Sequence, residues 1–252
     1  MPTVTSHQPG SFCWVELSTN DGAAARKFYS ELFGWTTRDV PISDGEVYTI
    51  FQNGGRDAAA MYAGNQGSGA PPNWMSYVAV ENTDEAVIRA KELGGSVLAE
   101  PMDVLDSGRM AVLMDNQGGV FSVWQANQHI GVGVRDELNA LCWNELQARD
   151  LDAAKRFYPP LFGWRMKESE EYTEWHLGEN AVGGAMTSNA PPEVPSFWIP
   201  YFAVDDCDST AQKAQALGGS VHVPCTDIER VGRFSVLVDP TGAAFSVIKT
   251  MM

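Results

Sequence analysis

Residues 12–35 read FCWVELSTNDGAAARKFYSELFGW, and residues 141–164 read LCWNELQARDLDAAKRFYPPLFGW. The two stretches are identical at 13 of 24 aligned positions, whereas unrelated sequences of ordinary composition would share about two. A second pair, residues 78–103 and 202–227, is identical at ten of 26 positions. The chain is therefore an internal duplication that spans nearly its whole length.

Each half reads as strand, helix and three strands, repeated twice. Residues 12–18 alternate as a strand does, and Asp21 is placed to cap a helix that Gly34 ends. The apolar stripe of that helix consists of Ala25, Phe28, Tyr29, Leu32 and Phe33. In the second copy, Pro159 and Pro160 predict that the corresponding helix kinks or stops early.

Composition narrows the class of protein. The chain has 252 residues, of which 44% are hydrophobic and 19% charged, so it can bury a sizeable core. A net charge of −15 disfavours nucleic acid and anionic membranes as partners. The first residues lack the pattern of a secretory leader, and no run approaches 18 apolar residues, so we expect a cytoplasmic protein. The four cysteines lack C-x-x-C spacing and indicate buried thiols.

The motifs FY-x-x-LFGW, LGG and D-x-x-G-x-x-F-S-V, in four βαβββ units, resemble the vicinal-oxygen-chelate superfamily of glyoxalases, bleomycin resistance proteins and extradiol dioxygenases. The tandem W-x-E-L opening is similar to two-domain actinobacterial members. The resemblance implies an α+β fold in which pairs of units form half-open β-barrels. We expect a tail at residues 1–10, a first domain at 11–127, a linker at 128–138 with few apolar anchors, and a second domain at 139–250.

The resemblance also implies a divalent metal held by His and Glu side chains from the barrel strands. The corresponding positions hold side chains that are poor ligands for a hard metal, namely Trp14, Met75, Ser122, Trp143, Ile199 and Ser246. We therefore predict no metal and no other cofactor. His176 lies in a predicted strand but has no counterpart in the other copy, so we do not count it as a ligand.

Strand alternation predicts what faces the barrel interior instead. If Trp14 faces inward, Glu16 does too, and the same holds for Trp143 and Glu145. The alternation predicts two aromatic pockets with one carboxylate each, which suits a planar or aromatic small molecule. The predicted ligand-binding residues are Trp14, Trp143, Met75, Ser122, Trp124, Ile199, Ser246, Arg109 and Arg233.

Three functions stay open. The leading hypothesis is a small-molecule-binding protein, monomeric or homodimeric, without nucleic-acid or membrane partners. The first alternative is a lyase, isomerase or oxygenase that uses Glu16 or Glu145 as general base and Tyr77 or Tyr201 as proton donor. The second is a regulatory or stress-related protein with vestigial pockets, in which the tryptophans fill the core and the glutamates pair with Arg109 and Arg233 in the matching SGR and VGR segments.

Overall fold

The computed structural model describes residues 4–43, 46–64 and 71–251, so the first three residues of the predicted tail lie outside it. The N-terminal half contains β1 (Phe12–Ser18), α1 (Gly22–Phe33), β2 (Thr36–Ser43), β3 (Glu46–Asn53), β4 (Arg56–Tyr62), β5 (Asn73–Ala79), α2 (Thr83–Glu92), β6 (Ser96–Val104), β7 (Gly108–Met114) and β8 (Val120–Ala126). The C-terminal half contains β9 (Leu141–Ala148), α3 (Leu151–Phe162), β10 (Arg165–Glu168), β11 (Tyr172–Leu177), β12 (Asn180–Thr187), β13 (Phe197–Ala203), α4 (Cys207–Ala216), β14 (Ser220–Ile228), β15 (Gly232–Val238) and β16 (Ala244–Thr250). The predicted α+β class and the strand, helix, three-strand repeat are confirmed.

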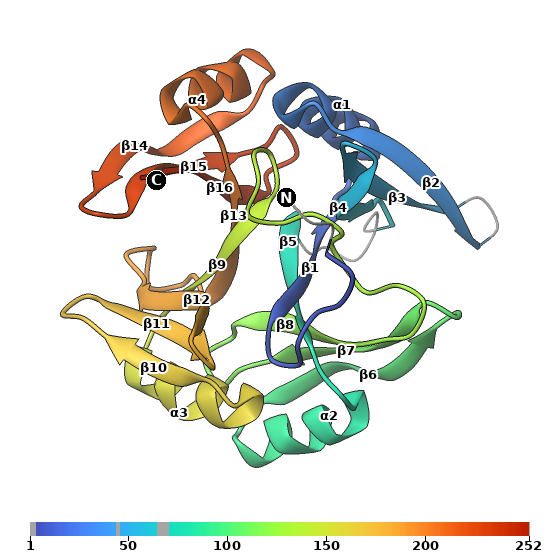
Figure 1. Cartoon of the computed structure of the whole chain (residues 1–252), viewed down its shortest axis with the longest axis vertical. Helices are drawn as coiled ribbons and strands as arrows, with labels where there is room; N and C mark the ends of the chain where they lie inside the picture. Colours follow the sequence, from blue (N-terminus) through green and yellow to red (C-terminus); the bar gives the residue numbers. More distant parts are fainter. Residues whose placement is uncertain (1–3, 44–45, 65–70, 252) are drawn as a thin grey trace.

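Each half forms its own eight-stranded sheet. The strand orders are β2-β3-β4-β1-β5-β8-β7-β6 and β10-β11-β12-β9-β13-β16-β15-β14. The two units of one half therefore pair with each other, through antiparallel β1–β5 and β9–β13. Both sheets curl, with the helices outside them (Figure 1). We call the face of each sheet that points away from the helices its inner face.

The first helix begins and ends where its sequence predicts. The side chain of Asp21 accepts a hydrogen bond from the backbone N–H of Ala24, and Gly34 ends the helix with a φ of 72°. In α3, however, the expected early stop does not occur, because the helix runs through Pro159 and Pro160 to Phe162. Both prolines fall in its last turns, and the burial of Phe157, Tyr158 and Phe162 holds those turns in place.

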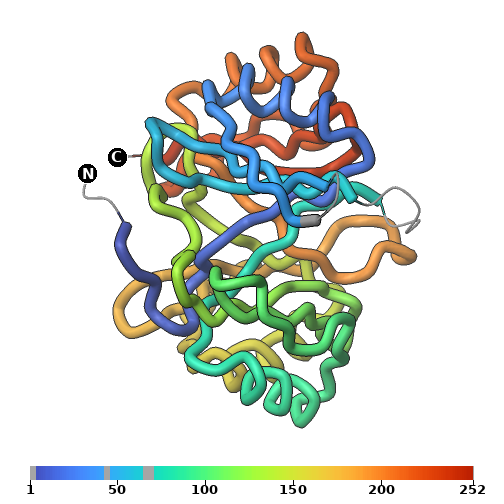
Figure 2. The backbone as a smooth tube through the Cα atoms, turned by 90° about the vertical axis from the view of Figure 1, so that its right-hand side faces the viewer, coloured from blue at the N-terminus to red at the C-terminus, as the bar shows by residue number. Residues whose placement is uncertain are grey.

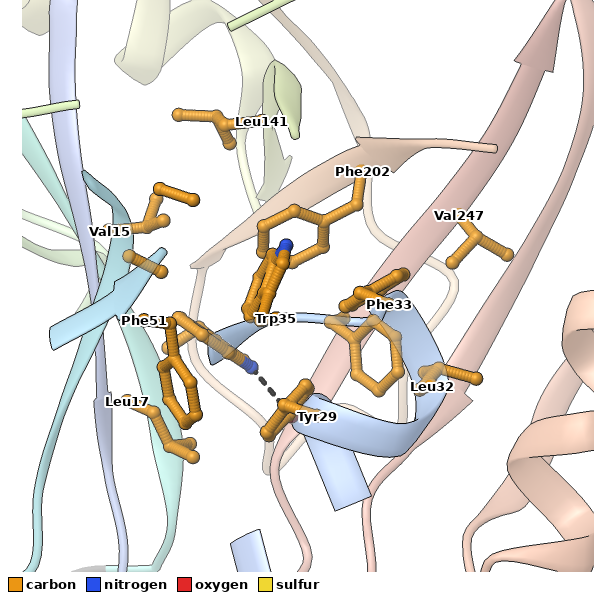
Figure 3. Packing of buried hydrophobic residues seen from close by; sticks show 14 of the residues in the cluster. Val15, Leu17, Tyr29, Leu32, Phe33, Trp35, Phe51, Leu141, Phe202 and Val247 are labelled. Carbon is orange, nitrogen blue, oxygen red and sulfur yellow. Dashed lines mark hydrogen bonds between the residues drawn. The ribbon is translucent and has the colours of Figure 1, made fainter. Parts of the chain in front are cut away.

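The hydrophobic cores are shared between the halves. Helix α1 packs beside α4 at one end of the molecule, and α2 beside α3 at the other (Figures 1 and 2). One core cluster joins Val15 and Phe33 of the first half to Phe202 and Val247 of the second (Figure 3). A second cluster in the same way joins residues of β8 and α2 to residues of α3 and β13. Each helix therefore contributes its apolar stripe to a core that also contains the other half's sheet.

Two tyrosines of the repeated FY motif cross this boundary. Tyr29 Oη donates to Asp239 Oδ2 at 2.8 Å, and Tyr158 Oη donates to Asp115 Oδ2 at 2.8 Å. The two aspartates are the first residues of the D-x-x-G-x-x-F-S-V motifs, and their other carboxylate oxygen closes the local turn through backbone N–H groups. The two motifs that mark each repeat thus meet across the halves.

The linker is anchored, contrary to the expectation that it has few apolar anchors. Val132 and Val134 are buried, and the N–H of Val132 donates to the carbonyl of Cys13 at 2.8 Å. A Cβ on Gly131 would lie 2.1 Å from that same carbonyl, so only glycine permits the close approach. The sequence of the linker does not reveal this anchoring, because it depends on contacts such as that of Val132 with Cys13, which are distant in the chain.

No helix among the described residues is long and apolar enough to cross a membrane.

Candidate functional site

The predicted inner-face residues of the first half lie together. In the strand register, Trp14 pairs with Tyr77, and Tyr77 pairs with Ser122 on the other side. Glu16 lies between Ala60 on β4 and Met75 on β5. Alternation along β1 directs Val15 and Leu17 to the opposite face, into the core shared with the second half.

A hydrogen-bonded chain links three of these side chains. The indole N–H of Trp14 donates to Tyr48 Oη at 3.0 Å, and Tyr48 Oη donates to Glu16 Oε2 at 2.6 Å. Burial raises the pKa of Glu16, and hydrogen bonds from Tyr48 and Tyr77 oppose that rise by stabilising the carboxylate. The carboxylate is therefore held by two phenols in a weakly hydrated place.

The second half repeats the chain with equivalent residues. The indole N–H of Trp143 donates to Tyr172 Oη at 2.8 Å, and Tyr201 Oη donates to Glu145 Oε1 at 2.9 Å. Burial raises the pKa of Glu145, while Tyr201, Tyr172 and Gln147 stabilise its charged form. Gln147 donates to the same Oε1 at 2.7 Å. A Trp–Tyr–Glu–Tyr network is thus present on both inner faces.

Sequence analysis missed the middle tyrosine of each network. Tyr48 and Tyr172 lie on β3 and β11, the second strand of the first hairpin in each half. A signal for them exists, since both precede a threonine, in the segments Tyr48-Thr-Ile and Tyr172-Thr-Glu. The repeated Tyr-Thr pair, at the same offset of 124 residues as the later repeat, would have placed a second phenol beside each carboxylate.

The two inner faces differ in what covers them. On the first, the ring of His129 from the linker meets Trp14 edge to face at a centroid distance of 4.8 Å, and Trp124 Nε1 donates to the His129 carbonyl at 2.8 Å. Val132 packs into the same cluster, and Trp14 is left only 5% exposed. The linker therefore covers Trp14 on the first inner face, whereas Glu16, Tyr48 and Met75 on the same face stay partly exposed.

On the second inner face the tryptophan is more exposed than on the first. Ile199, Tyr201 and Ile248 form its buried floor. Trp143 and Phe234 pack on this floor and stay partly exposed, and Phe234 lies 6.3 Å from the Tyr201 ring. The aromatic surface of Trp143 and Phe234 is thus accessible in this half, whereas the Glu145 side chain is itself buried, with 7% exposed.

The family assignment follows from the sequence comparison. The model of the Glyoxalase/Bleomycin resistance protein/Dioxygenase superfamily matches residues 11–122 and again residues 138–247. The chain belongs to this superfamily. The two matched segments correspond to the two sheets, so the chain is a tandem member with one family domain per half.

Individual relatives and solved structures agree with this family assignment. The chain is 40% identical to CFP32 of Mycobacterium tuberculosis, a protein provisionally named a glyoxylase, over 99% of this chain and 98% of CFP32. It is 35% identical to the anthracycline biosynthesis protein DnrV of Streptomyces peucetius, over 98% of this chain and 95% of DnrV. The Mn(II)-bound glyoxalase of Novosphingobium aromaticivorans superposes with a TM-score of 0.67 at 14% identity, over 96% of this chain and 82% of that one. This last likeness shows the fold alone.

The residues present do not fit the divalent metal that the superfamily fold implies. Each inner face offers one carboxylate, and tyrosine hydroxyls already bond to it. The other polar groups are mainly indole, phenol and serine side chains, which are poor ligands for a hard cation. The Gln147 amide of the second face already donates to Glu145, and the first face adds the single imidazole of His129, whose ring packs against Trp14. Across residues 4–43, 46–64 and 71–251, no group of three or more His, Cys, Asp or Glu side chains is placed to hold a metal ion.

Arg109 and Arg233 do not belong to the inner faces, which corrects both roles considered for them. Arg109 pairs with Asp84 at 2.8 Å and with Asp103 at 2.9 Å, and Arg233 pairs with the equivalent acids of the other half. Alternate side chains of a strand point to the same face. Arg109 therefore lies on the same face of β7 as buried Ala111, which is the face covered by α2. The glutamates are therefore held by tyrosines and not by arginines.

Two cavities lie beside the N-terminal tail. The smaller, about 280 Å³, is lined by Ser6, His7, Trp124 and Ile130 among others. The larger, about 480 Å³, lies between the tail, Arg135 and the hairpin of β11 and β12.

Proposed function

We propose that this superfamily member binds a small planar organic molecule on the inner face of its C-terminal half. The observation that carries the proposal is the difference between two equivalent networks. Trp143 is partly exposed beside Glu145, whereas Trp14 is buried under the linker. A tryptophan that is covered in one copy of the duplicated site and accessible in the other favours one ligand per chain.

The chemistry of this face suits an aromatic ligand with a hydrogen-bonding substituent. Trp143 and Phe234 offer ring surface on which a planar molecule can stack. Glu145 and its tyrosine partners offer a few fixed polar groups that set the orientation of the ligand. The relative DnrV is named for anthracycline biosynthesis, and anthracyclines contain a planar fused-ring quinone, which supports a ligand of this type.

The state of the cysteines and the net charge of the chain are consistent with this proposal. The four cysteines are free thiols, as expected of a cytoplasmic protein, and the net charge of −15 disfavours polyanionic partners. We therefore place the protein in the cytoplasm as a monomer or homodimer whose partner is the small molecule itself. No metal takes part in the proposed binding.

Proton transfer catalysis on the same ligand is the second candidate, and the buried carboxylate favours it. Burial raises the pKa of Glu145, and a carboxyl group with a raised pKa suits a general base that works near neutral pH. Tyr201, whose hydroxyl lies 2.9 Å from Glu145 Oε1, would serve as the proton donor. The reaction class would be that of a lyase or isomerase of this superfamily.

Fluorescence titration with hydroxylated anthraquinones tests the proposal. The ligand should quench the tryptophan emission of the wild type, and Trp143→Ala should weaken binding at least about tenfold, since stacking and burial of an indole contribute on the order of 2–4 kcal/mol. Trp14→Ala is the matched control in the covered half and should leave the affinity unchanged. Quenching that responds to both substitutions alike, or to neither, would reject the C-terminal site and leave vestigial pockets as the better account.

Glu145→Gln separates the two candidates. If the protein only binds, the substitution changes affinity or selectivity modestly and no product forms from any bound ligand. If the protein is an enzyme, it leaves binding nearly intact and abolishes turnover, as loss of a general base does. Glu16→Gln in the covered half should change neither.

A further inference from the structure

Two of the four thiols lie in contact with each other. Cys207 Sγ, at the first residue of α4, is 3.3 Å from Cys225 Sγ on the edge strand β14. Both are free thiols, Cys207 is buried and Cys225 is partly exposed. The pair lies on the helix-covered face of the sheet, opposite to the inner face.

The other cysteines and the other half lack such a pair. In the repeat, the positions of Cys207 and Cys225 correspond to Thr83 and Pro101. Cys142 donates to the carbonyl of Tyr201 at 3.3 Å and not to another thiol. Burial raises the pKa of Cys142 to about 12, which makes it a poor nucleophile. The paired thiols are therefore a specific feature of the C-terminal half.

We propose that Cys207 and Cys225 form a reversible disulfide when the protein meets hydrogen peroxide. The Cys225 thiolate attacks the terminal oxygen of the O–O bond, which breaks, so that a sulfenic acid forms and water leaves. The Cys207 sulfur then displaces hydroxide from Cys225, and the two thiol protons end in the two water molecules formed. Each sulfur loses one electron overall, and the peroxide is reduced by two.

The geometry assigns the order of these steps. Cys225 reacts first because it is the partly exposed thiol, whereas Cys207 is buried and burial raises its pKa. Cys207 then resolves the sulfenic acid because it already lies in contact with it. The bond would link two residues that are 18 positions apart in the chain, Cys207 and Cys225, and fasten the start of α4 to the edge strand. A disulfide in a cytoplasmic protein is expected to be transient and to respond to oxidants.

The test uses the full-length protein, reduced and then exposed to a small excess of hydrogen peroxide. Intact mass should fall by two hydrogens, peptide mapping should join Cys207 to Cys225, and a thiol reductant should reverse both changes. The melting temperature of the oxidised protein should rise by roughly 5–10 °C, as a loop of this length predicts. Cys225→Ser should abolish the link and the rise, whereas Cys142→Ser should retain both.

Other outcomes overturn the proposal. These are oxidation of Cys225 to sulfinic acid without a link, a link that involves Cys13 or Cys142, and recovery of all thiols unchanged. None of these outcomes bears on ligand binding at Glu145, so the proposal stands or fails independently of the proposed function.

Discussion

The hydroxyl of Tyr29 ties the two halves together, and Tyr29→Phe measures how much that tie contributes. The hydroxyl donates to Asp239 at 2.8 Å and accepts from Trp74 Nε1 at 2.9 Å, and all three residues are buried. The substitution keeps the ring but leaves the indole N–H without its acceptor and removes one donor to the carboxylate. Because each buried polar group that loses its partner costs about 1–3 kcal/mol, we expect the free energy of unfolding to fall by about 2–4 kcal/mol.

Urea unfolding measures this loss, and hydrogen exchange of peptides from β4 and β16 locates it. With an m-value of about 3 kcal/mol per molar, the midpoint should fall by on the order of 1 M. Peptides from both halves should lose protection together, because one core cluster contains both. Tyr158→Phe, in the equivalent contact with Asp115, is the matched variant and should cost a similar amount. A C-terminal half that stays protected while the N-terminal half unfolds would refute the shared core.

Three further predictions concern the inner faces. Burial raises the pKa of Glu145 above its usual 4.5, so its contribution to stability is fully present below that pH and is lost as the pH rises through the folded pKa. The melting temperature of the wild type relative to Glu145→Gln should therefore fall as the pH rises above 4.5, and a constant difference would contradict the raised pKa. A Cβ on Gly184 would lie 2.2 Å from Tyr172 Oη, so Gly184→Ala should displace that ring and weaken ligand binding at least about tenfold, whereas Ala60→Gly at the equivalent register position should not. Protein purified without chelator and dialysed should hold well below one zinc, nickel, manganese or iron per chain by elemental analysis, and stoichiometric metal would show that a ligand set exists.

Local signals predicted the elements well. Helix α1 begins after Asp21 and ends at Gly34 as expected, because capping and αL termination depend only on neighbouring residues. The partner of its apolar stripe could not be predicted in the same way. Periodicity indicates that Tyr29 is buried, but its acceptor Asp239 lies 210 residues further along the chain. The shared cores therefore emerge only when both sheets are in place.

In the candidate site, too, local features could be predicted from the sequence and long-range contacts could not. Alternation correctly grouped Trp14 with Glu16, because both lie on one regular strand. The arginine assignment failed because a matched position in the repeat does not say which face of β7 Arg109 occupies. The contact of His129 with Trp14 on the first inner face could not be predicted either, since it depends on the path of the linker in space.

Calorimetric titration of the full-length protein with a hydroxylated anthraquinone tests the central claim most directly, because it counts sites. The account predicts one ligand per chain, a stoichiometry and affinity unchanged in Trp14→Ala, and an affinity at least about tenfold weaker in Trp143→Ala. Two ligands per chain would contradict the covering of the first inner face by the linker. Binding that keeps its affinity in Trp143→Ala but disappears in Trp14→Ala would place the site in the N-terminal half and contradict the proposed function.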